Sequence, residues 1–498
     1  MISATSTEVV VAGGGTAGCV VAARLAEAGR DVVLVEAGPD HGALADGRWP
    51  RELLDAGTIP TSHDWGYTSG DAVPRPGLAF ERAKVIGGCS AHNGCTVSWG
   101  TRADYDGWAA MGLAGWGADE LLPIFRSVSR RLRVRRFSPA EWVPFHRGFI
   151  QAGEARGLPV ADDLESLDGG PAVGAEPSNS PEGIRWNTAF AYLDALRGSP
   201  NLRVMPDTLV DRVLLDGARA VGLRAIGPAG DLEIRADLVV LAGGTYGSPA
   251  VLLRSGVGPA PELRAVGVDP VVDLPGVGRN LHDHPGSELY LAPSEELERR
   301  TAAFATQGYP VPDEQSMATV ASSGCRDAPF DLHVFPERAM DGRLAVFVAL
   351  LTPRSRGRLT LADRDPRSAP RLDHAYLTDP AGRDLATLVE GVGIARDLLA
   401  APGLALLVAG ELEPGPGADL HRAVRERVLH YWHPVGTCAL GSVTDARGRV
   451  LGVDGLVVAD ASVMPITVRA TTNLPTVVVA ERISAWLVSG SDGEPVVP

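Results

Sequence analysis

The sequence predicts a chain of mixed α/β and α+β class, in which an α/β domain built from several stretches of chain is interlocked with a smaller domain on an antiparallel sheet. Two observations support this prediction. Strand–turn–helix order opens the chain and returns after residue 430, whereas residues 287–425 consist of short strands and one long helical stretch. With 498 residues the chain also exceeds the length at which a single core usually stops growing. We therefore expect two domains.

Hydrophobic periodicity predicts the individual elements in order along the chain. They are a strand at 9–12, a helix at 19–28, a strand at 31–36, a helix at 118–128, strands at 208–215, 218–226, 238–242, 331–335 and 344–351, a helix at 384–399, a strand at 456–460 and a helix from about 476. Asp216 and Gly217 lie between two of these strands and predict a hairpin turn. Residues 40–80 lack periodicity and predict a long surface loop.

Composition argues against several classes of protein. The 46 basic and 61 acidic side chains give a net charge of −15 without a basic face, so nucleic acid is not an expected partner. No apolar run reaches the roughly 18 residues of a membrane span. The short polar segment before the first strand leaves no room for a signal peptide, and we expect a cytoplasmic protein. Five scattered cysteines without a CxxC pair argue against a disulfide framework or a thiolate metal site.

A GxGxxG pattern at residues 13–18 lies between the first predicted strand and the first predicted helix. Gly13 permits a tight turn, Gly15 lets backbone N–H groups approach a pyrophosphate, and Gly18 lets the helix pack on the strand. The phosphates then lie at a helix N-terminus, which favours negative charge. Glu36 ends the next strand, where a carboxylate accepts hydrogen bonds from an adenosine ribose. These features predict a Rossmann-like dinucleotide-binding domain; a purely structural glycine turn is the alternative.

Two long segments resemble the sequence motifs of one enzyme family. Residues 82–94 (RAKVIGGCSAHNG) resemble the first motif of the glucose–methanol–choline (GMC) oxidoreductases, and residues 244–258 (GTYGSPAVLLRSGVG) resemble the second. The resemblance covers nearly the whole chain, because it continues through 275–285, 352–357, 433–438 and 472–476.

The resemblance implies FAD as the cofactor. It also implies two domains that are each assembled from separate stretches of the chain. We expect an FAD-binding domain from residues 1–150, 196–286 and 430–498, and a substrate-binding domain from residues 151–195 and 287–429. The resemblance and the GxGxxG turn together assign cofactor binding to Gly13, Gly15, Thr16, Ala17, Gly18, Glu36, Ala37, Gly87, Gly88, Ser90, His92, Asn93, Gly94, Val210, Asp460, Ala461, Pro475 and Thr476. By the resemblance, Val210 aligns with the family position whose backbone meets the adenine. A buried capping role is the alternative for Asp460.

Two further residues match the family's catalytic positions, His433 and its partner Asn473. Oxidation of an alcohol removes a proton from oxygen and a hydride from carbon, and FAD accepts the hydride. An imidazole can accept this proton, because it is mostly unprotonated at neutral pH. An amide hydrogen-bonds the substrate oxygen but is not a base. His433 is therefore the expected base. His430 is a candidate to support His433 or to fill a packing position. Trp432 is a candidate for the wall of the substrate pocket or for the core.

His92 precedes the motif residue Asn93, where most family members carry an aliphatic residue. The segment resembles the flavin-attachment segment of the choline-oxidase branch, in which a histidine bonds to the flavin 8α-methyl carbon. We therefore expect covalent FAD through His92; an unbonded ring packed against the flavin is the alternative. His282 and His284 bracket Asp283, but a third convincing ligand is missing, and no metal is expected.

The expected reaction is FAD-dependent oxidation of an alcohol to a carbonyl. Residues 287–425 have few aromatics and no evident cage for a quaternary ammonium, which favours sugars, glycosides and polyols over small aliphatic, aryl or amino alcohols. Oxygen or another carrier would accept the electrons. The alternatives are a flavin-containing lyase on the same scaffold, a nicotinamide-dependent enzyme, and a non-catalytic nucleotide-binding module.

Overall fold

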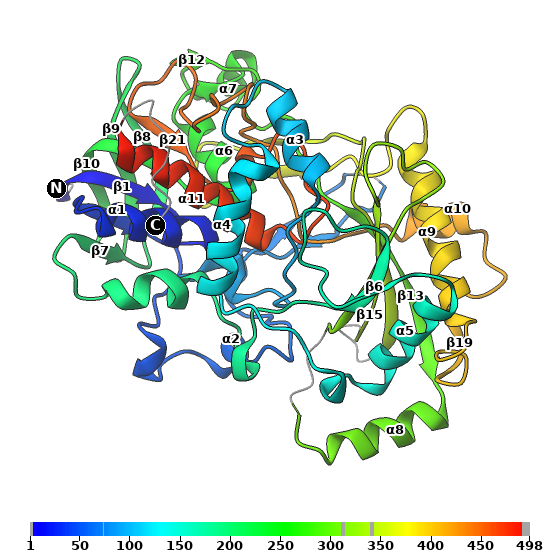
Figure 1. Cartoon of the computed structure of the whole chain (residues 1–498). Helices are drawn as coiled ribbons and strands as arrows, with labels where there is room; N and C mark the ends of the chain where they lie inside the picture. The colour runs from blue at the N-terminus through cyan, green and yellow to red at the C-terminus, as the bar shows by residue number, and fades with distance from the viewer. Residues whose placement is uncertain (1–2, 73, 310–313, 339–342, 491–498) are drawn as a thin grey trace.

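The computed structural model describes residues 3–72, 74–309, 314–338 and 343–490. Its elements form two large sheets, one in each half of the view in Figure 1. The ends of the predicted domain ranges at 1–2 and 491–498 lie outside the described residues, and the domain boundaries stay a prediction.

The first sheet has seven strands within the described residues, and five of them are parallel in the order β7-β2-β1-β10-β21. The remaining two extend it as an antiparallel meander, β10-β9-β8. The strands are β1 (Ser3–Ala12), β2 (Val32–Val35), β7 (Leu202–Met205), β8 (Leu209–Asp216), β9 (Arg219–Gly227), β10 (Gly230–Leu241) and β21 (Leu456–Val458).

Apolar residues explain why this sheet forms. The central strands β1 and β2 are buried over Val9–Ala12 and Val32–Val35, which is the pattern of parallel strands covered on both faces. Helix α1 (Thr16–Glu27) packs against α11 (Asn473–Ser489), and α11 packs against α4 (Ala118–Arg131).

The second sheet has eight strands within the described residues, and every pairing except β5–β6 is antiparallel. An antiparallel sheet in this part of the chain was predicted and is confirmed. The strands are β5 (Val160–Ala161), β6 (Ala172–Ala175), β13 (Pro285–Pro293), β14 (Ser316–Val320), β15 (Leu332–Arg338), β16 (Leu344–Leu350), β19 (Val408–Glu413) and β20 (Leu429–His430). Helix α9 (Arg383–Leu399) packs against β16, and α5 (Pro144–Ala155) packs against β14.

Further helices and short strand pairs lie outside the two large sheets. The remaining helices are α2 (Arg51–Leu54), α3 (Arg102–Ala110), α6 (Gly244–Arg254), α7 (Ala260–Ala265), α8 (Glu295–Ala305) and α10 (Leu420–Glu426). Two-stranded pairs join β3 (Tyr67–Thr68) with β4 (Ala79–Phe80), β11 (Val257–Gly258) with β12 (Val272–Asp273), and β17 (Arg358–Thr360) with β18 (Arg371–Asp373). Single turns of helix lie at Leu44–Asp46, Gly88–Ala91, Pro139–Glu141, Pro181–Gly183, Ala189–Leu193, Asp194–Leu196 and Ala461–Val463.

The predicted α/β and α+β class is confirmed, and the element bounds differ mainly at their ends. The strand predicted at 9–12 begins at Ser3, because its polar first half pairs with residues 232–236 of β10. The last helix begins at Asn473, earlier than predicted, so this residue is helical. The hairpin around Asp216 and Gly217 is confirmed.

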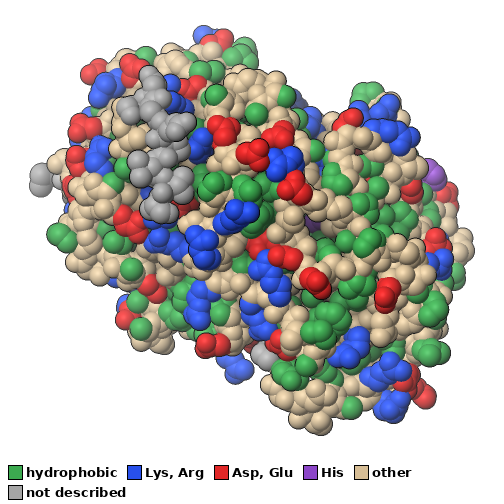
Figure 2. All heavy atoms as spheres, viewed as in Figure 1, with side chains coloured by type: hydrophobic (Ala, Val, Ile, Leu, Met, Phe, Trp, Pro, Cys, Tyr) green, Lys and Arg blue, Asp and Glu red, His purple; other side chains and the backbone are tan. Residues whose placement is uncertain are grey.

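The surface is of mixed charge. Figure 2 shows acidic and basic side chains interspersed over the viewed face. In the described part of the chain, no helix combines the length and the apolar character that crossing a bilayer requires. All five cysteines are free thiols.

Candidate active site

The carboxyl ends of four parallel strands bring several of the predicted cofactor residues to one edge of the first sheet. Gly13 follows β1 and donates its N–H to the Val35 carbonyl at the end of β2, at 2.8 Å. The Ala242 N–H, after β10, donates to the Ala12 carbonyl at 2.8 Å, and the Ala459 N–H, after β21, donates to the Leu241 carbonyl at 2.9 Å. Ligands of open α/β sheets bind at this edge.

The two glycine motifs pack against each other at this edge. A Cβ on Gly18 would lie 1.8 Å from the Gly13 carbonyl oxygen, and a Cβ on Gly88 would lie 2.5 Å from the Gly15 Cα. The Gly87 N–H donates to the Gly14 carbonyl at 2.8 Å. Only glycine permits this approach, and Gly15, directly before α1, has no side chain. Such a helix N-terminus fits the pyrophosphate of a dinucleotide.

Ser90 and Thr16 join these two motifs through side chains. The Ser90 N–H donates to Thr16 Oγ1 at 3.1 Å, and Ser90 Oγ donates to the Gly87 carbonyl at 2.6 Å. Ala17 is buried beside Thr16 in the first turn of α1. These contacts fix the second motif over the N-terminus of α1.

Glu36 lies where the sequence predicts it, directly after β2. Its Oε2 accepts from the Gly14 N–H and its Oε1 accepts from the Gly38 N–H, both at 2.8 Å. Burial raises the pKa of Glu36 to about 7, although these two N–H groups oppose the shift. Each carboxylate oxygen has a further lone pair, so ribose hydroxyls can still donate to it. Ala37 continues the chain between Glu36 and Gly38.

Asp460 occupies a capping position at this edge. Its Oδ1 accepts from the Ser462 N–H at 2.8 Å, and its Oδ2 accepts from the Gly244 N–H at 2.8 Å. The hydroxyls of Ser248 and Ser462 also donate to it at 2.5 Å. The carboxylate therefore ties α6 to the turn that opens at Ala461, which is the capping role weighed as the alternative for this residue.

The other predicted cofactor residues lie on separate elements. Val210 lies in β8 and accepts a hydrogen bond from Arg254 Nη2 at 3.3 Å through its carbonyl. Pro475 and Thr476 lie in the first turn of α11, where Thr476 Oγ1 donates to the Thr472 carbonyl at 2.7 Å. Asn93 Oδ1 accepts from the Cys95 N–H at 3.3 Å, and a Cβ on Gly94 would lie 3.5 Å from Glu314.

His92 is buried and in contact with the backbone of the 40–80 segment. Its Nε2 lies 2.8 Å from the Ser62 carbonyl oxygen, which can only accept, so Nε2 carries the proton. The lone pair of the neutral ring is then on Nδ1. Burial lowers the pKa of His92, which keeps the imidazole neutral.

Strand pairing in the second sheet places His433 beside His284. Pro285 pairs with His430 where β13 meets β20. The contact continues beyond the strands, because the Tyr431 N–H donates to the His284 carbonyl at 3.0 Å and the Val435 N–H donates to the His282 carbonyl at 2.9 Å. As a result, the Nδ1 atoms of His284 and His433 lie 3.1 Å apart. The sequence showed only an HxH pattern here and missed this contact.

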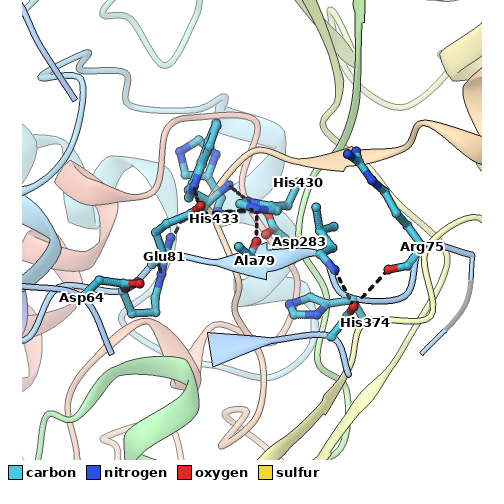
Figure 3. A network of polar contacts seen from close by, with 12 residues as sticks. Asp64, Arg75, Ala79, Glu81, Asp283, His374, His430 and His433 are labelled. Atoms are coloured by element: carbon cyan, nitrogen blue, oxygen red, sulfur yellow. Dashed lines mark hydrogen bonds and ion pairs between the residues drawn. The ribbon is translucent and has the colours of Figure 1, made fainter. Parts of the chain in front are cut away.

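A buried carboxylate and a positive charge complete the surroundings of His433. Asp283 Oδ1 accepts from the His433 backbone N–H at 2.9 Å (Figure 3). Burial raises the pKa of Asp283 to about 7, while the Arg82 charge opposes the shift. Burial lowers the pKa of His433 well below its usual range, and the neighbouring His284 and Arg82 act in the same direction. A neutral imidazole is the form that accepts a proton.

Asn473 is the first residue of α11, and its Nδ2 is buried without a hydrogen-bond partner among the described residues. Buried polar atoms in proteins are nearly always satisfied. An unpartnered amide donor at this position fits a ligand oxygen. The structure gives no direct contact between Asn473 and His433 within the described residues.

His430 and Trp432 do not contact the His433 ring through hydrogen bonds. Figure 3 shows the contact between His430 and Ala79, in which His430 Nε2 lies 2.7 Å from the Ala79 carbonyl oxygen. This contact gives His430 a packing role. Trp432 is 38% exposed and donates from Nε1 to Glu81 at 2.8 Å. Core packing of Trp432, one of the two predicted roles, is therefore wrong.

Aromatic side chains of the second sheet gather beside the candidate base. The Tyr431 and His433 rings lie 4.3 Å apart between centroids. Tyr431 also contacts Phe335 and Phe347, each at 5.3 Å, and its hydroxyl is buried without a hydrogen-bond partner among the described residues. The aromatic cluster consists of Phe330, Phe335, Phe347 and Tyr431 with Met317. The sequence did not show that these separated residues meet next to His433.

Alcohol oxidation by a flavin needs a dinucleotide cradle and a proton acceptor, and the described residues provide a candidate for each. Together they define the class of FAD-dependent alcohol oxidoreductases. Family models described as GMC oxidoreductase match residues 7–286 and 353–480. The chain therefore belongs to the GMC oxidoreductase family, as its motifs predicted.

Known proteins resemble the chain over almost its full length. The 5-(hydroxymethyl)furfural oxidase of Methylovorus sp. (strain MP688) is 35% identical, over 96% of this chain and 98% of that protein. The choline oxidase of Arthrobacter globiformis is 31% identical, over 97% of this chain and 95% of that protein. Among solved structures, pyridoxine 4-oxidase from Mesorbium loti superposes with a TM-score of 0.85 at 28% identity, over 96% of this chain and 98% of that chain. FAD as cofactor and oxidation of an alcohol are thereby established at the level of the family.

Proposed function

We propose that this enzyme oxidises a primary alcohol carried on a small flat ring, with His433 as the base. The observation that carries the proposal is the aromatic cluster whose Tyr431 ring lies 4.3 Å from the His433 ring. Aromatic side chains beside the base favour a planar substrate over a polyhydroxylated one, which needs many polar partners. Two proteins similar to this chain bear the names of substrates with a hydroxymethyl group on an aromatic ring, 5-(hydroxymethyl)furfural and pyridoxine.

His433 takes the hydroxyl proton in this proposal. Its Nδ1 contacts His284, so Nε2 is the ring nitrogen left to face a substrate. Asn473 donates its unpartnered Nδ2–H to the substrate oxygen and stabilises the negative charge that develops there. When bound, FAD supplies the hydride acceptor.

An amino alcohol is the second candidate, favoured by two carboxylates near the aromatic cluster. Glu176 Oε2 and Glu314 Oε2 both lie within hydrogen-bond distance of Thr96 Oγ1, at 3.0 and 2.6 Å. The two carboxylates act electrostatically on the Tyr431 hydroxyl, whose pKa burial already raises. Carboxylates beside aromatic faces are a setting for a cationic ammonium group. The preference for sugars, glycosides and polyols stays a prediction.

Oxygen is the electron acceptor that we propose, because two of the similar proteins bear the name oxidase and their names include no other carrier.

A panel of alcohols tests the proposed substrate class and the proposed electron acceptor. Anaerobic bleaching of the flavin by 5-(hydroxymethyl)furfural, pyridoxine, choline and glucose ranks the substrate classes, and air admitted afterwards should restore the colour with hydrogen peroxide as product. Bleaching by glucose alone would contradict the ring-alcohol proposal. Turnover of a cyanohydrin without any bleaching by alcohols would favour the lyase alternative.

His92 is the residue that we propose to carry the flavin covalently. Its neutral, buried ring has the nucleophilic lone pair that the bond needs. The bond would replace one hydrogen of the imidazole and one of the flavin 8α-methyl group. Bound FAD would take up the two electrons and two protons so released, and the electron acceptor would then remove them.

A further inference from the structure

The side chains of His284 and His433 share one hydrogen between their Nδ1 atoms. These atoms lie 3.1 Å apart, and the two rings are nearly perpendicular, at 82°. His284 is fully buried, and burial lowers its pKa to about 3. Because His284 is then neutral at any working pH of the enzyme, it carries a single N–H, on either Nδ1 or Nε2.

The position of that single hydrogen decides whether His433 can act as a base. If His284 Nδ1–H donates, His433 must accept at Nδ1 and carries its own hydrogen on Nε2, which is then no base. If His433 Nδ1–H donates, its Nε2 keeps a free lone pair. Among the described residues Nε2 of His433 has no hydrogen-bond partner, and the side chain is only partly buried. The second arrangement alone leaves this open nitrogen able to take a proton.

The other nitrogen of His284 has a partner suited to the second arrangement. His284 Nε2 lies 3.0 Å from Thr467 Oγ1, which can accept its N–H. The Thr467 backbone N–H donates to His282 Nε2 at 3.0 Å. His282 must therefore carry its hydrogen on Nδ1, where it donates to the Asn280 carbonyl at 2.6 Å. This chain of contacts fixes Thr467 beside His284.

We propose that His284 is a positioning residue for His433: its Nδ1 accepts the His433 Nδ1–H and thereby holds His433 in the tautomer with an unprotonated Nε2. The same hydrogen bond becomes charge-assisted when Nε2 takes the substrate proton, so it also stabilises the imidazolium. In the catalytic triad of serine proteases, a carboxylate does this for a histidine. Here the nearest carboxylate, Asp283, binds the His433 backbone instead. The inference rests on the proposed role of His433 as the base.

Ring-¹⁵N histidine NMR of the holoenzyme tests the tautomer without any substrate. The His433 signals are assigned by their loss in His433→Ala. We expect a protonated Nδ1 and a bare Nε2 in the wild type, and a loss of this preference in His284→Ala. A wild-type His433 with its hydrogen on Nε2 would overturn the proposal.

Three substitutions of His284 then test the consequence for catalysis. The side-chain oxygen of His284→Asn can stand where Nδ1 stands and accept from His433, whereas that of His284→Gln reaches toward the Nε2 position and Thr467. With 5-(hydroxymethyl)furfural as the probe alcohol, we expect the limiting rate of anaerobic flavin reduction to fall at least ~10-fold in His284→Ala and His284→Gln, a part of the 10²–10⁴ that a positioned base contributes. His284→Asn should recover most of that loss, with the apparent Kd for the alcohol unchanged in all three.

The controls separate this inference from the proposed function. Equal rates in His284→Asn and His284→Gln, at full FAD content, would mean that His284 only packs. A normal rate in His433→Ala would instead refute the base assignment itself. If the probe does not bleach the wild type, the NMR result alone decides the tautomer.

Discussion

Replacement of Gly15 by alanine should damage the cofactor site without damage to the fold. Gly15 lies just before α1 with φ −77° and ψ −162°, an extended conformation that alanine adopts freely. A Cβ there would meet only the Gly88 Cα, at 3.7 Å, which is an ordinary van der Waals contact. Because alanine also loses less chain entropy on folding, stability should stay within ~1 kcal/mol of the wild type.

The substitution should instead weaken FAD binding, because it removes hydrogen bonds to the pyrophosphate. A methyl group at the N-terminus of α1 holds the phosphates away from the backbone N–H groups, and each charge-assisted hydrogen bond lost costs roughly 1.5–3 kcal/mol. One such bond corresponds to a Kd for FAD that is about 10–150-fold weaker. Gly18→Ala differs, because its Cβ would lie 1.8 Å from the Gly13 carbonyl oxygen and the turn itself must open.

The assay is a titration of the FAD-free protein with FAD, followed by flavin fluorescence, in a His92→Ala background so that binding is reversible. Urea unfolding of the same FAD-free proteins checks the fold. Gly247→Ala is the matched control, since a Cβ there meets nothing within 4 Å. Wild-type FAD affinity in Gly15→Ala would refute the placement of the pyrophosphate at this turn.

Three further predictions follow from the site. Burial lowers the pKa of His433, so kcat/KM should stay flat through neutral pH and fall only below about 6.5, the usual histidine value; a midpoint above that value would contradict the assignment. Asn473→Ala should slow flavin reduction about 10–1000-fold through loss of the amide donor, and a wild-type rate would exclude that role. Denaturing electrophoresis should show flavin fluorescence on the wild-type chain and none on His92→Ala; loss of all colour from the wild type would leave His92 unbonded.

Local sequence patterns predicted several features of the first sheet and of its candidate cofactor site. The turn at residues 13–18, the acid at Glu36 and the hairpin at 216–217 depend on neighbours close in sequence, and the structure has each of them. Strand ends were less accurate. Four of residues 3–7 are polar, and this segment forms a strand only because β10 lies beside it.

Contacts between distant segments could not be predicted. His284 and His433 are 149 residues apart, and they meet because β20 pairs with β13. The aromatic cluster has the same origin, since its members come from β14, the segment before β15, β15 itself, β16 and the segment after β20. A count of aromatics in the sequence suggested a site poor in them, whereas the sheet brings the few that exist to one place.

The central claim is that His433 removes the proton while the flavin accepts the hydride. Rapid mixing of the enzyme with its best alcohol under anaerobic conditions measures this step directly. We expect the limiting rate of flavin reduction in His433→Ala to be at least ~100-fold lower than in the wild type, with FAD still bound, and the rate in the neighbouring control His430→Asn to change far less. A His433→Ala enzyme that bleaches at nearly the wild-type rate would contradict the account.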